Sequence, residues 1–572
     1  MNAIQQLISE HMDIWTGADT GKRSGRGRAS GNAGSVYGVK KLRELILELA
    51  VRGKLVQQDA NDEPASELLK RIQAQKTKSL AATAEVEKPF DLPIGWEWVS
   101  FGEIAQHNSG KTLDKGRNKG VLRDYITTSN LYWGVFELDS VKQMPIEESE
   151  LERCTAQKGD LLICEGGEAG RAAVWNFDKE VCFQNHVHRA RLYEGISPFY
   201  AYRYFEKLNA SGEIEQYRKG VGISNMSGKA LSSVVFSLPP LAEQHRIVTK
   251  VDELMELCDQ LEAQHSNASE AHEKLISHLL GTLTQSQSAD DFNANWQRIV
   301  AHFDTLFTTE VSIDALKQTL LQLAVMGKLV PQDANDEPAS ELLKRIQAEK
   351  AKLVTEGKIK KDKPLAAVGD DEKLFELPKS WEWTRLGVIA QKLTDGSHNP
   401  PKDAGSGLPM LSSQNINLGK IDFNSPSRFV TEEDFGIENS RTKIESNDVL
   451  LTIVGSLGRS AVVPNNAPKF VLQRSVAVIK TELFSEFLCL QLSSPFSANY
   501  FNLHGKGTAQ KGIYLGQLSE MPIVIPSIAE QYRIVTKVDA LMALCEQLKT
   551  LIQQSNKQQQ AIANVLVAQV LN

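Results

Sequence analysis

The 572-residue sequence lacks long hydrophobic runs and is poor in cysteine. No stretch of about 18 apolar residues is present, so no membrane-spanning helix is expected. The opening segment MNAIQQLISEHMDIW lacks the basic start and apolar middle of a signal peptide. The six cysteines form no Cys-x-x-Cys pair, which argues against a disulfide framework or a zinc site. We therefore expect a cytoplasmic protein with buried, reduced thiols and no membrane partner.

An excess of positive charge is also missing. The net charge is −7, which excludes a uniformly basic coat for nucleic acid but leaves room for a local basic face. Residues 99–237 hold 17 Lys and Arg against 18 Asp and Glu, and residues 384–524 hold 13 against 12. The acidic excess therefore belongs to the segments outside these two regions, where protein partners are the expected ligands.

Motifs for catalysis are absent. The segment AQHNSGKT (105–112) resembles a phosphate-binding loop, but Ala105 replaces the first glycine and a poor helix start follows. Its copy AQKLTDGS (390–397) has no Gly-Lys-Thr. The segment HNPPKD (398–403) contains the Asn-Pro-Pro of amino-methyltransferases, but Lys402 stands where an aromatic residue stacks on the flipped base.

Metal-ligand spacing is absent as well. His186 and His188 have no Cys or acidic partner at ligand spacing, so they are interpreted as ordinary polar residues. No catalytic, cofactor-binding or metal-binding residue is expected in this chain.

What the sequence does contain is a tandem duplication. Residues 53–76 and 327–350 differ at only two of 24 positions. Two further pairs of segments match closely: LPIGWEWVSFGEIA (92–105) with LPKSWEWTRLGVIA (377–390), and LAEQHRIVTKVDELMELCDQLE (241–262) with IAEQYRIVTKVDALMALCEQLK (528–549). The residues between have diverged, although TTSNLYWG (127–134) still matches SSQNINLG (412–419), and GRAAV (170–174) matches GRSAV (458–462). This pattern indicates one repeated structural frame, made by the nearly identical segments, that holds two domains with different recognition surfaces.

The frame is predicted to be helical. Apolar residues recur with heptad spacing at Ile247, Val251, Leu254, Cys258 and Leu261, and again at Ile534, Val538, Leu541, Cys545 and Leu548. LRELILELA places Leu42, Leu45, Ile46 and Leu49 on one face. Long paired helices are favoured over an ordinary amphipathic bundle, because the pattern occurs twice.

The diverged regions alternate short β-type runs with helical pieces. The predicted fold class is therefore α+β: two α/β domains separated by long antiparallel, coiled-coil-like helical segments, in a pseudo-twofold tandem repeat. We call residues 99–237 the first inner domain and residues 384–524 the second inner domain. The remaining segments are an amino-terminal helical half with a linker, a central helical scaffold with a linker, and a carboxy-terminal helix: 1–98, 238–383 and 525–572.

Polar residues in the inner domains are the candidates for DNA contact. Lys and Arg neutralise phosphates, whereas Asn, Gln and Arg read base edges in the major groove. For any single residue a solvated loop remains the alternative, but the duplicated sets together favour DNA. The candidates are Lys111, Lys115, Arg117, Lys119, Thr128, Ser129, Asn130, Arg171, Gln184, Asn185, His186, Ser413, Gln414, Asn415, Arg459, Gln473, Arg474, Gln510 and Lys511.

The layout resembles the specificity subunit of type I restriction–modification systems. The resemblance is carried by two LP-x-x-WEW entries, two P-x-hydrophobic-AEQ-x-RIV exits and a long helix after each exit. It implies a non-catalytic subunit whose two target recognition domains each read one half of a bipartite, asymmetric site in double-stranded DNA. It also implies methyltransferase subunits and restriction or motor subunits as partners. S-adenosylmethionine, ATP and Mg would be bound by those partners, and no cofactor by this chain.

Two alternatives compete with this interpretation. One is a structural scaffold protein without sequence-specific DNA binding, and the other is a nucleotide-dependent enzyme. The first leaves the diverged paired domains unexplained, and the second needs a cofactor loop that the sequence lacks.

Overall fold

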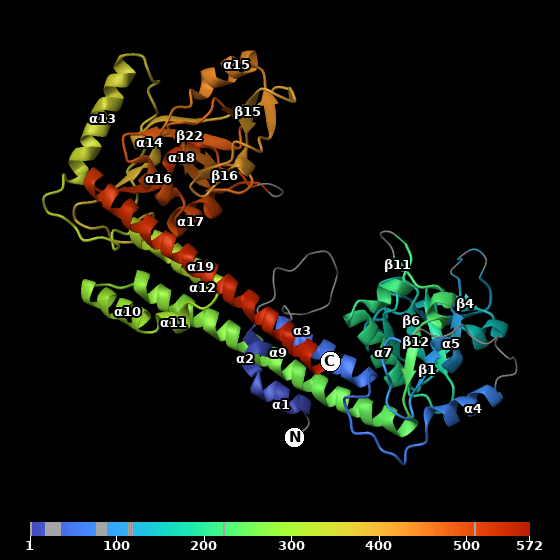
Figure 1. Cartoon of the computed structure of the whole chain (residues 1–572). Coiled ribbons are helices and arrows are strands. Elements are labelled where there is room, and N and C mark those ends of the chain that lie inside the picture. Colours follow the sequence, from blue (N-terminus) through green and yellow to red (C-terminus); the bar gives the residue numbers. More distant parts are fainter. Residues whose placement is uncertain are drawn as a thin grey trace. The chain divides into compact units, whose positions relative to one another are not determined.

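The computed structural model describes residues 3–17, 36–75, 88–112, 114, 116, 118–220, 224–507 and 511–571. The chain divides into two compact units (Figure 1). Unit 1 comprises Met1–Ser269 and Gln554–Asn572, and unit 2 comprises Glu270–Gln553. Within the described ranges, no helix is both long and apolar enough to cross a membrane.

Unit 1 contains the first inner domain and helices of the scaffold. Its helices are α1 (Ala3–Glu10), α2 (Met12–Gly17), α3 (Tyr37–Val51), α4 (Ala65–Gln75), α5 (Phe101–Ile104), α6 (Leu151–Cys154), α7 (Pro198–Ala210), α8 (Gly228–Ser232) and the start of α9 (Leu241–Thr284). Its strands are β1 (Glu97–Ser100), β2 (Ala105–Ser109), β3 (Val121–Ile126), β4 (Lys142–Ile146), β5 (Thr155–Ala156), β6 (Leu161–Cys164), β7 (Gly166–Gly167), β8 (Ala172–Val174), β9 (Val181–Phe183), β10 (Val187–Leu192), β11 (Ser224–Asn225) and β12 (Val235–Leu238).

Unit 2 contains the second inner domain and the corresponding scaffold helices. Its helices are α10 (Ala289–Ala301), α11 (Phe303–Leu306), α12 (Glu310–Val325), α13 (Ala339–Thr355), α14 (Leu386–Ile389), α15 (Glu432–Thr442), α16 (Ser485–Leu492), α17 (Pro495–His504), α18 (Leu515–Glu520) and the start of α19 (Ile528–Leu571). Its strands are β13 (Glu382–Arg385), β14 (Ala390–Asp395), β15 (Leu408–Leu411), β16 (Ile416–Asn417), β17 (Lys420–Ile421), β18 (Arg428–Val430), β19 (Val449–Thr452), β20 (Ser460–Val462), β21 (Val471–Leu472), β22 (Val476–Thr481) and β23 (Pro522–Ile525).

The two inner domains share one sheet topology. The strand order β2-β10-β6-β8 in the first recurs as β14-β22-β19-β20 in the second, and β4-β3-β9 recurs as β18-β15-β21. In each domain one strand pair is parallel, β3 with β9 and β15 with β21. The strand pairing therefore confirms the predicted α+β duplication. The shared topology extends over residues whose sequences no longer match.

The predicted scaffold helices form, and their apolar seams face a core. Both α9 and α19 run for 44 residues. The five seam residues of α9 are all buried, as are Ile534, Val538 and Cys545 of α19, with Leu541 and Leu548 half-buried. The predicted face of α3 is buried as well.

These helices pair antiparallel, as contacts along them demonstrate. Arg43 near the start of α3 bonds Asp259 and Glu262 of α9, both at 2.7 Å, whereas Gln58 beyond the end of α3 bonds Glu243 at 2.6 Å. In unit 2, Lys549 of α19 bonds Asp314 at 3.0 Å and the preceding turn, at Glu546, pairs with Lys317 of α12. Sequence numbers rise along one helix and fall along the other in both units.

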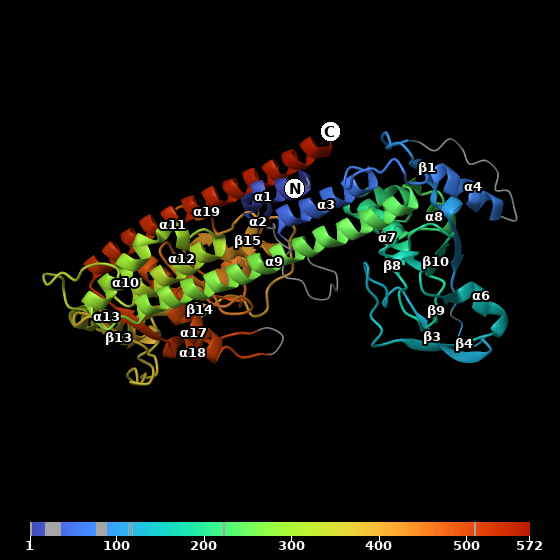
Figure 2. The same ribbon diagram turned by 90° about the horizontal axis from the view of Figure 1, so that it is seen from below.

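The end of each long helix closes the core of the unit that contains the start of the other. In unit 1, Ala563 of α19 is buried in one cluster with Ile8, Trp15 and the face of α3. In unit 2, Ile276, Leu280 and Leu283 of α9 occupy the same place beside α12. Figure 2 follows α9 and α19 from another side. Both ends of the chain therefore belong to unit 1, as a pseudo-twofold repeat requires.

The nearly identical segments meet at one buried carboxylate in each unit. Trp96 Nε1 donates to Glu243 at 2.9 Å and Gln58 Nε2 donates to it at 2.6 Å. In unit 2, Trp381 and Gln332 donate to Glu530 at 3.0 and 2.6 Å. Burial raises the pKa of Glu243 and of Glu530, and these hydrogen bonds oppose the shift.

A buried carboxylate that loses one donor keeps its desolvation cost, so no member can change alone without loss of stability. Each donor and acceptor comes from a different repeated segment: the 24-residue stretch, the Trp-Glu-Trp entry and the Ala-Glu-Gln exit. This junction gives a physical reason for the two copies to stay alike.

Gly327 lies at this junction and tolerates no side chain. Its φ is +69°, and a Cβ there would lie 2.5 Å from Pro378 Cγ and 3.1 Å from the Trp381 ring. Gly357 has the same conformation, φ +68°, but nothing within 4 Å. Both alanine variants carry the left-handed backbone cost, so Gly327→Ala should destabilise unit 2 by about 1–3 kcal/mol more than Gly357→Ala. Denaturant unfolding measures the difference, and equal losses would show that the packing against Pro378 is unimportant.

Candidate nucleic-acid interface

The loops that follow the central strands begin at one edge of each inner domain. Parallel strands have their carboxyl ends at the same edge, so the loops after β3 and β9 start side by side, as do those after β15 and β21. We call the loops at this edge the strand-end loops. They are residues 110–112, 127–130, 165–171 and 184–186 in the first inner domain, and 396–398, 412–415, 453–459 and 473–475 in the second.

The same main-chain hydrogen bonds join these loops in both domains. The matched pairs are Lys111 N to Phe183 O (2.9 Å) with Ser397 N to Leu472 O (2.7 Å), Gln184 N to Ile126 O (2.9 Å) with Gln473 N to Leu411 O (2.8 Å), Asn185 N to Lys111 O (2.9 Å) with Arg474 N to Ser397 O (2.9 Å), and Glu165 N to His186 O (2.8 Å) with Ile453 N to Ser475 O (2.9 Å). One backbone frame therefore presents two sets of side chains.

Asn130 and Asn415 stabilise this frame from inside. Asn130 is 4% exposed and Asn415 is 1% exposed. The Oδ1 of Asn130 accepts from Thr127 N at 3.0 Å, and its amide donates to Glu137 O at 3.0 Å. Asn415 repeats both bonds, from Ser412 N at 2.9 Å and to Asp422 O at 3.2 Å. The structure places these two candidates in turns, with their amides already used.

Three other candidates are engaged with residues elsewhere in the protein, and Ser129 Oγ lies 2.7 Å from Thr127 Oγ1 within its own turn. Lys111 forms an ion pair with Glu150. Arg171 bonds the Thr128 carbonyl at 2.5 Å and Glu168 at 3.3 Å, and it lies 4.9 Å from the Tyr132 ring centre. Gln473 donates to Ser427 Oγ at 3.2 Å. These contacts order the strand-end loops.

The remaining described candidates differ between the domains. In the first, Lys119, Ser129 and His186 are exposed, and Thr128, Gln184 and Asn185 are half-buried. In the second, Gln414, Arg474 and Lys511 are exposed, and Ser413 and Arg459 are half-buried. Within the part of the chain that the structure describes, the side chains of Arg459, Arg474 and Lys511 make no hydrogen bond or ion pair. Lys115, Arg117 and Gln510 lie outside the described residues.

Sequence reasoning missed a matched pair of arginines at this edge. Arg153 Nη1 donates to the carbonyls of Ser109 and Gly110 at 3.0 and 3.1 Å. Arg441 bonds Asp395, which also bonds His398 Nε2 at 2.8 Å. The two arginines are 288 positions apart, the offset that also relates GRAAV to GRSAV. Extending that alignment over LERC and NSRT is the signal that finds them.

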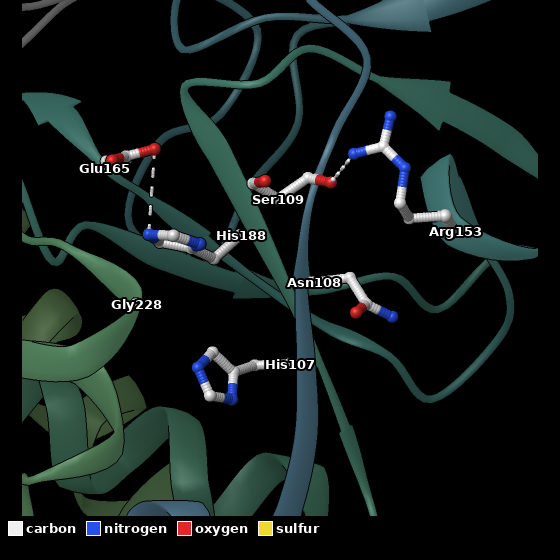
Figure 3. Close-up of a pocket in the computed structure, with 7 residues that line it drawn as sticks. All are labelled: His107, Asn108, Ser109, Arg153, Glu165, His188 and Gly228. Carbon is white, nitrogen blue, oxygen red and sulfur yellow. Dashed lines mark hydrogen bonds and ion pairs between the residues drawn. The ribbon is translucent and has the colours of Figure 1, made fainter. Parts of the chain in front are cut away.

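A polar cleft of about 380 Å³ opens beside these residues in the first inner domain (Figure 3). His107, Asn108, Ser109, Arg153, Glu165, His188 and Gly228 line it. His188 is 3% exposed; its Nε2 lies 3.1 Å from the Met226 carbonyl and 3.8 Å from Glu165, and its buried Nδ1 has no partner among the described residues. His107 Nε2 lies 3.0 Å from Ser232 Oγ. The described residues contain no group of three or more His, Cys, Asp or Glu suited to hold a metal ion.

Acidification should destabilise the first inner domain through His107. Burial and the neighbouring His188 lower the pKa of His107 below its ordinary value. The unfolded chain takes up this proton near pH 6.5 while the folded chain resists it, so the contribution of His107 to stability is present above pH 6.5 and is lost as the pH falls through the lowered pKa. Thermal unfolding from pH 7.5 to 5.5 should therefore show a larger fall for the unmodified chain than for His107→Leu. Parallel curves would contradict this assignment.

Comparisons with known proteins agree with the duplicated layout. The family model described as "Type I restriction modification DNA specificity domain" matches residues 93–270 and 401–556. The EcoAI type I restriction enzyme specificity subunit of Escherichia coli is 39% identical over 594 residues, and the EcoEI specificity subunit of the same species is 36% identical over 623 residues; each alignment covers 100% of both chains. The solved HsdS subunit from Thermoanaerobacter tengcongensis is 16% identical, with a TM-score of 0.39 over 85% of this chain and 99% of that chain.

Proposed function

Because this chain belongs to the type I restriction–modification DNA specificity family, we propose that the strand-end loops of each inner domain contact one half of a bipartite, asymmetric DNA site. As a member of that family the chain is a non-catalytic specificity subunit with two target recognition domains in tandem. One observation carries the proposal: the same main-chain hydrogen bonds hold these loops in both domains, while the side chains that they expose differ.

The residues divide into two groups under this proposal. Arg459, Arg474, Lys511 and Lys119 supply positive charge to phosphates or to guanine edges. Amide, hydroxyl and imidazole groups read bases, and they come from Thr128, Ser129, Gln184, Asn185, His186, Ser413 and Gln414. Lys115, Arg117 and Gln510 stay candidates from the sequence. Lys111, Asn130, Arg171, Asn415 and Gln473 act by holding the loops in place.

A specificity subunit of a type I complex works with DNA and partner subunits. We place methyltransferase subunits, which bring S-adenosylmethionine, and restriction or motor subunits, which bring ATP and Mg, on the duplicated scaffold. The buried carboxylate junction occurs twice, and this repetition of the scaffold supports two equivalent docking positions for the partners. The recognition domains are then residues 99–237 and 384–524. The six cysteines are all buried free thiols, which suits the cytoplasm.

Substitution of the free arginines tests the proposal. Arg474→Ala and Arg459→Ala should each weaken DNA binding by the assembled complex. A loss of about 1–3 kcal/mol confined to one base pair of one half-site identifies a base contact. A uniform loss with a shallower salt dependence identifies a phosphate contact.

Lys480→Ala is the matched control, because Lys480 lies at the far end of β22 from these loops and pairs with Glu445. It should leave binding unchanged. If both arginine variants bind like this control, the chain acts as a scaffold and the assignment of the strand-end loops fails.

A further inference from the structure

The duplication supplies an internal reference for the polar cleft. Gly110 N bonds Val187 O at 3.2 Å, and Gly396 N bonds Val476 O at 3.1 Å, so these positions are equivalent. These positions, together with the matched bonds of Glu165 and Ile453, show that three polar residues of the cleft have apolar counterparts in the second inner domain. His107 corresponds to Leu393, Glu165 to Ile453 and His188 to Ala477.

The apolar set packs as ordinary core. Ile453 is 3% exposed and Ala477 is 0% exposed, and Leu393 packs against the same cluster. The polar set instead surrounds an open volume and leaves the buried Nδ1 of His188 without a partner among the described residues. An unsatisfied buried polar atom reduces stability. The same backbone accepts a better-packed alternative, so packing does not explain the polar set.

The cleft belongs to the strand-end loops. Glu165 begins the loop 165–171 and its main chain bonds His186 of the neighbouring loop, at 2.8 Å. Ser109, which Figure 3 shows between Glu165 and Arg153, directly precedes Gly110 and Lys111. The volume of the cleft, about 380 Å³, is within the range of roughly 300–1,000 Å³ that is typical of binding sites for small groups. A group that enters from these loops therefore meets Glu165 on one side and Arg153 on the other.

The chemistry of the lining selects the kind of group. An ionised carboxylate only accepts hydrogen bonds and repels a phosphate, which argues against a backbone contact. In the major groove, the hydrogen-bond donors on base edges are the amino groups N4 of cytosine and N6 of adenine. Glu165 is thus matched to a base and not to the DNA backbone.

We propose that this cleft receives the edge of one base in the half-site read by the first inner domain, with Glu165 accepting a hydrogen bond from the exocyclic amino group of cytosine or adenine. The proposal rests on the function proposed above. Glu165 is then a specificity-determining residue, and the second inner domain, with Ile453 there, reads its half-site without such a contact.

Glu165→Gln tests this with little change in shape, since it replaces an acceptor-only group by an amide. The assembled complex with its partner subunits is used, first unmodified to define its methylated sequence by sequencing the DNA. Duplexes with each base pair replaced in turn then measure discrimination. Glu165→Gln should lower discrimination about 5- to 150-fold at one cytosine- or adenine-containing pair of the first half-site. Which base is lost tells cytosine from adenine.

A second variant and a control secure the result. His107→Leu/Glu165→Ile/His188→Ala copies the second inner domain, should fold as judged by thermal unfolding, and should lose discrimination at the same pair. Glu194→Gln is the control: Glu194 is exposed two residues beyond the end of β10, and its substitution should change nothing. Full discrimination by Glu165→Gln at every position, or an equal loss for all sequences, overturns the proposal. An unmodified complex without preference for a bipartite site would instead refute the function proposed above.

Discussion

A chain with seven residues inserted into both α9 and α19 should methylate the same two half-site sequences, separated by a longer spacer. None of residues 262–275 of α9 or 549–562 of α19 is buried; the buried residues of the two cores lie on either side, although half-buried Ile552 packs against the core of unit 2. An insertion in these segments therefore leaves the buried residues of both cores in place. Seven residues are two helical turns, so the helix faces stay in phase to within about 20°.

The size of the effect follows from helix geometry. Seven residues add about 10.5 Å at 1.5 Å per residue, close to the rise of three base pairs at about 3.4 Å each. The spacer should therefore lengthen by up to about three base pairs. Insertion into α9 alone is the control, and it should reduce methylation because one helix is then longer than its counterpart. Altered half-site sequences with an unchanged spacer would show that these helices do not set the distance.

The scaffold could be predicted from the sequence because its signal is local. Ile247, Val251 and Leu254 follow heptad spacing, and the structure buries all three. The antiparallel pairing inside each unit, and the closure of unit 1 by Ala563, come from contacts between segments far apart in the chain. Heptad periodicity indicates which face of a scaffold helix is apolar. It does not indicate which segment packs against that face; for this the duplication was needed.

The candidate site could be predicted only in part. The matched residues at offsets 285 to 289 pointed to loops that the structure brings to one edge of each inner domain, but did not indicate which side chains are used inside the protein. Asn130 is a residue type that can read bases, but in the structure its amide is used by hydrogen bonds with Thr127 N and Glu137 O, which residue type alone does not indicate. Arg153 and Glu165 were missed because the cleft joins α6, β2 and β10, whose proximity no local pattern indicates.

We expect the two inner domains to be interchangeable on the shared scaffold. The boundaries of the two domains support an exchange: β1 pairs with β12 in the register Val99 with Phe236, and β13 pairs with β23 in the register Thr384 with Ile523. The exchange replaces residues 99–237 by a second copy of residues 384–524. Both domain positions of the scaffold are then occupied by the same inner domain, and nearly identical scaffold segments flank it in each.

The measurement is to assemble that chain with its partner subunits and to sequence the DNA sites that the complex methylates. We expect a bipartite site composed of the second domain's half-site twice, with the first domain's half-site absent. A methylated sequence that still contains the first domain's half-site, or that retains neither half-site, would contradict this expectation.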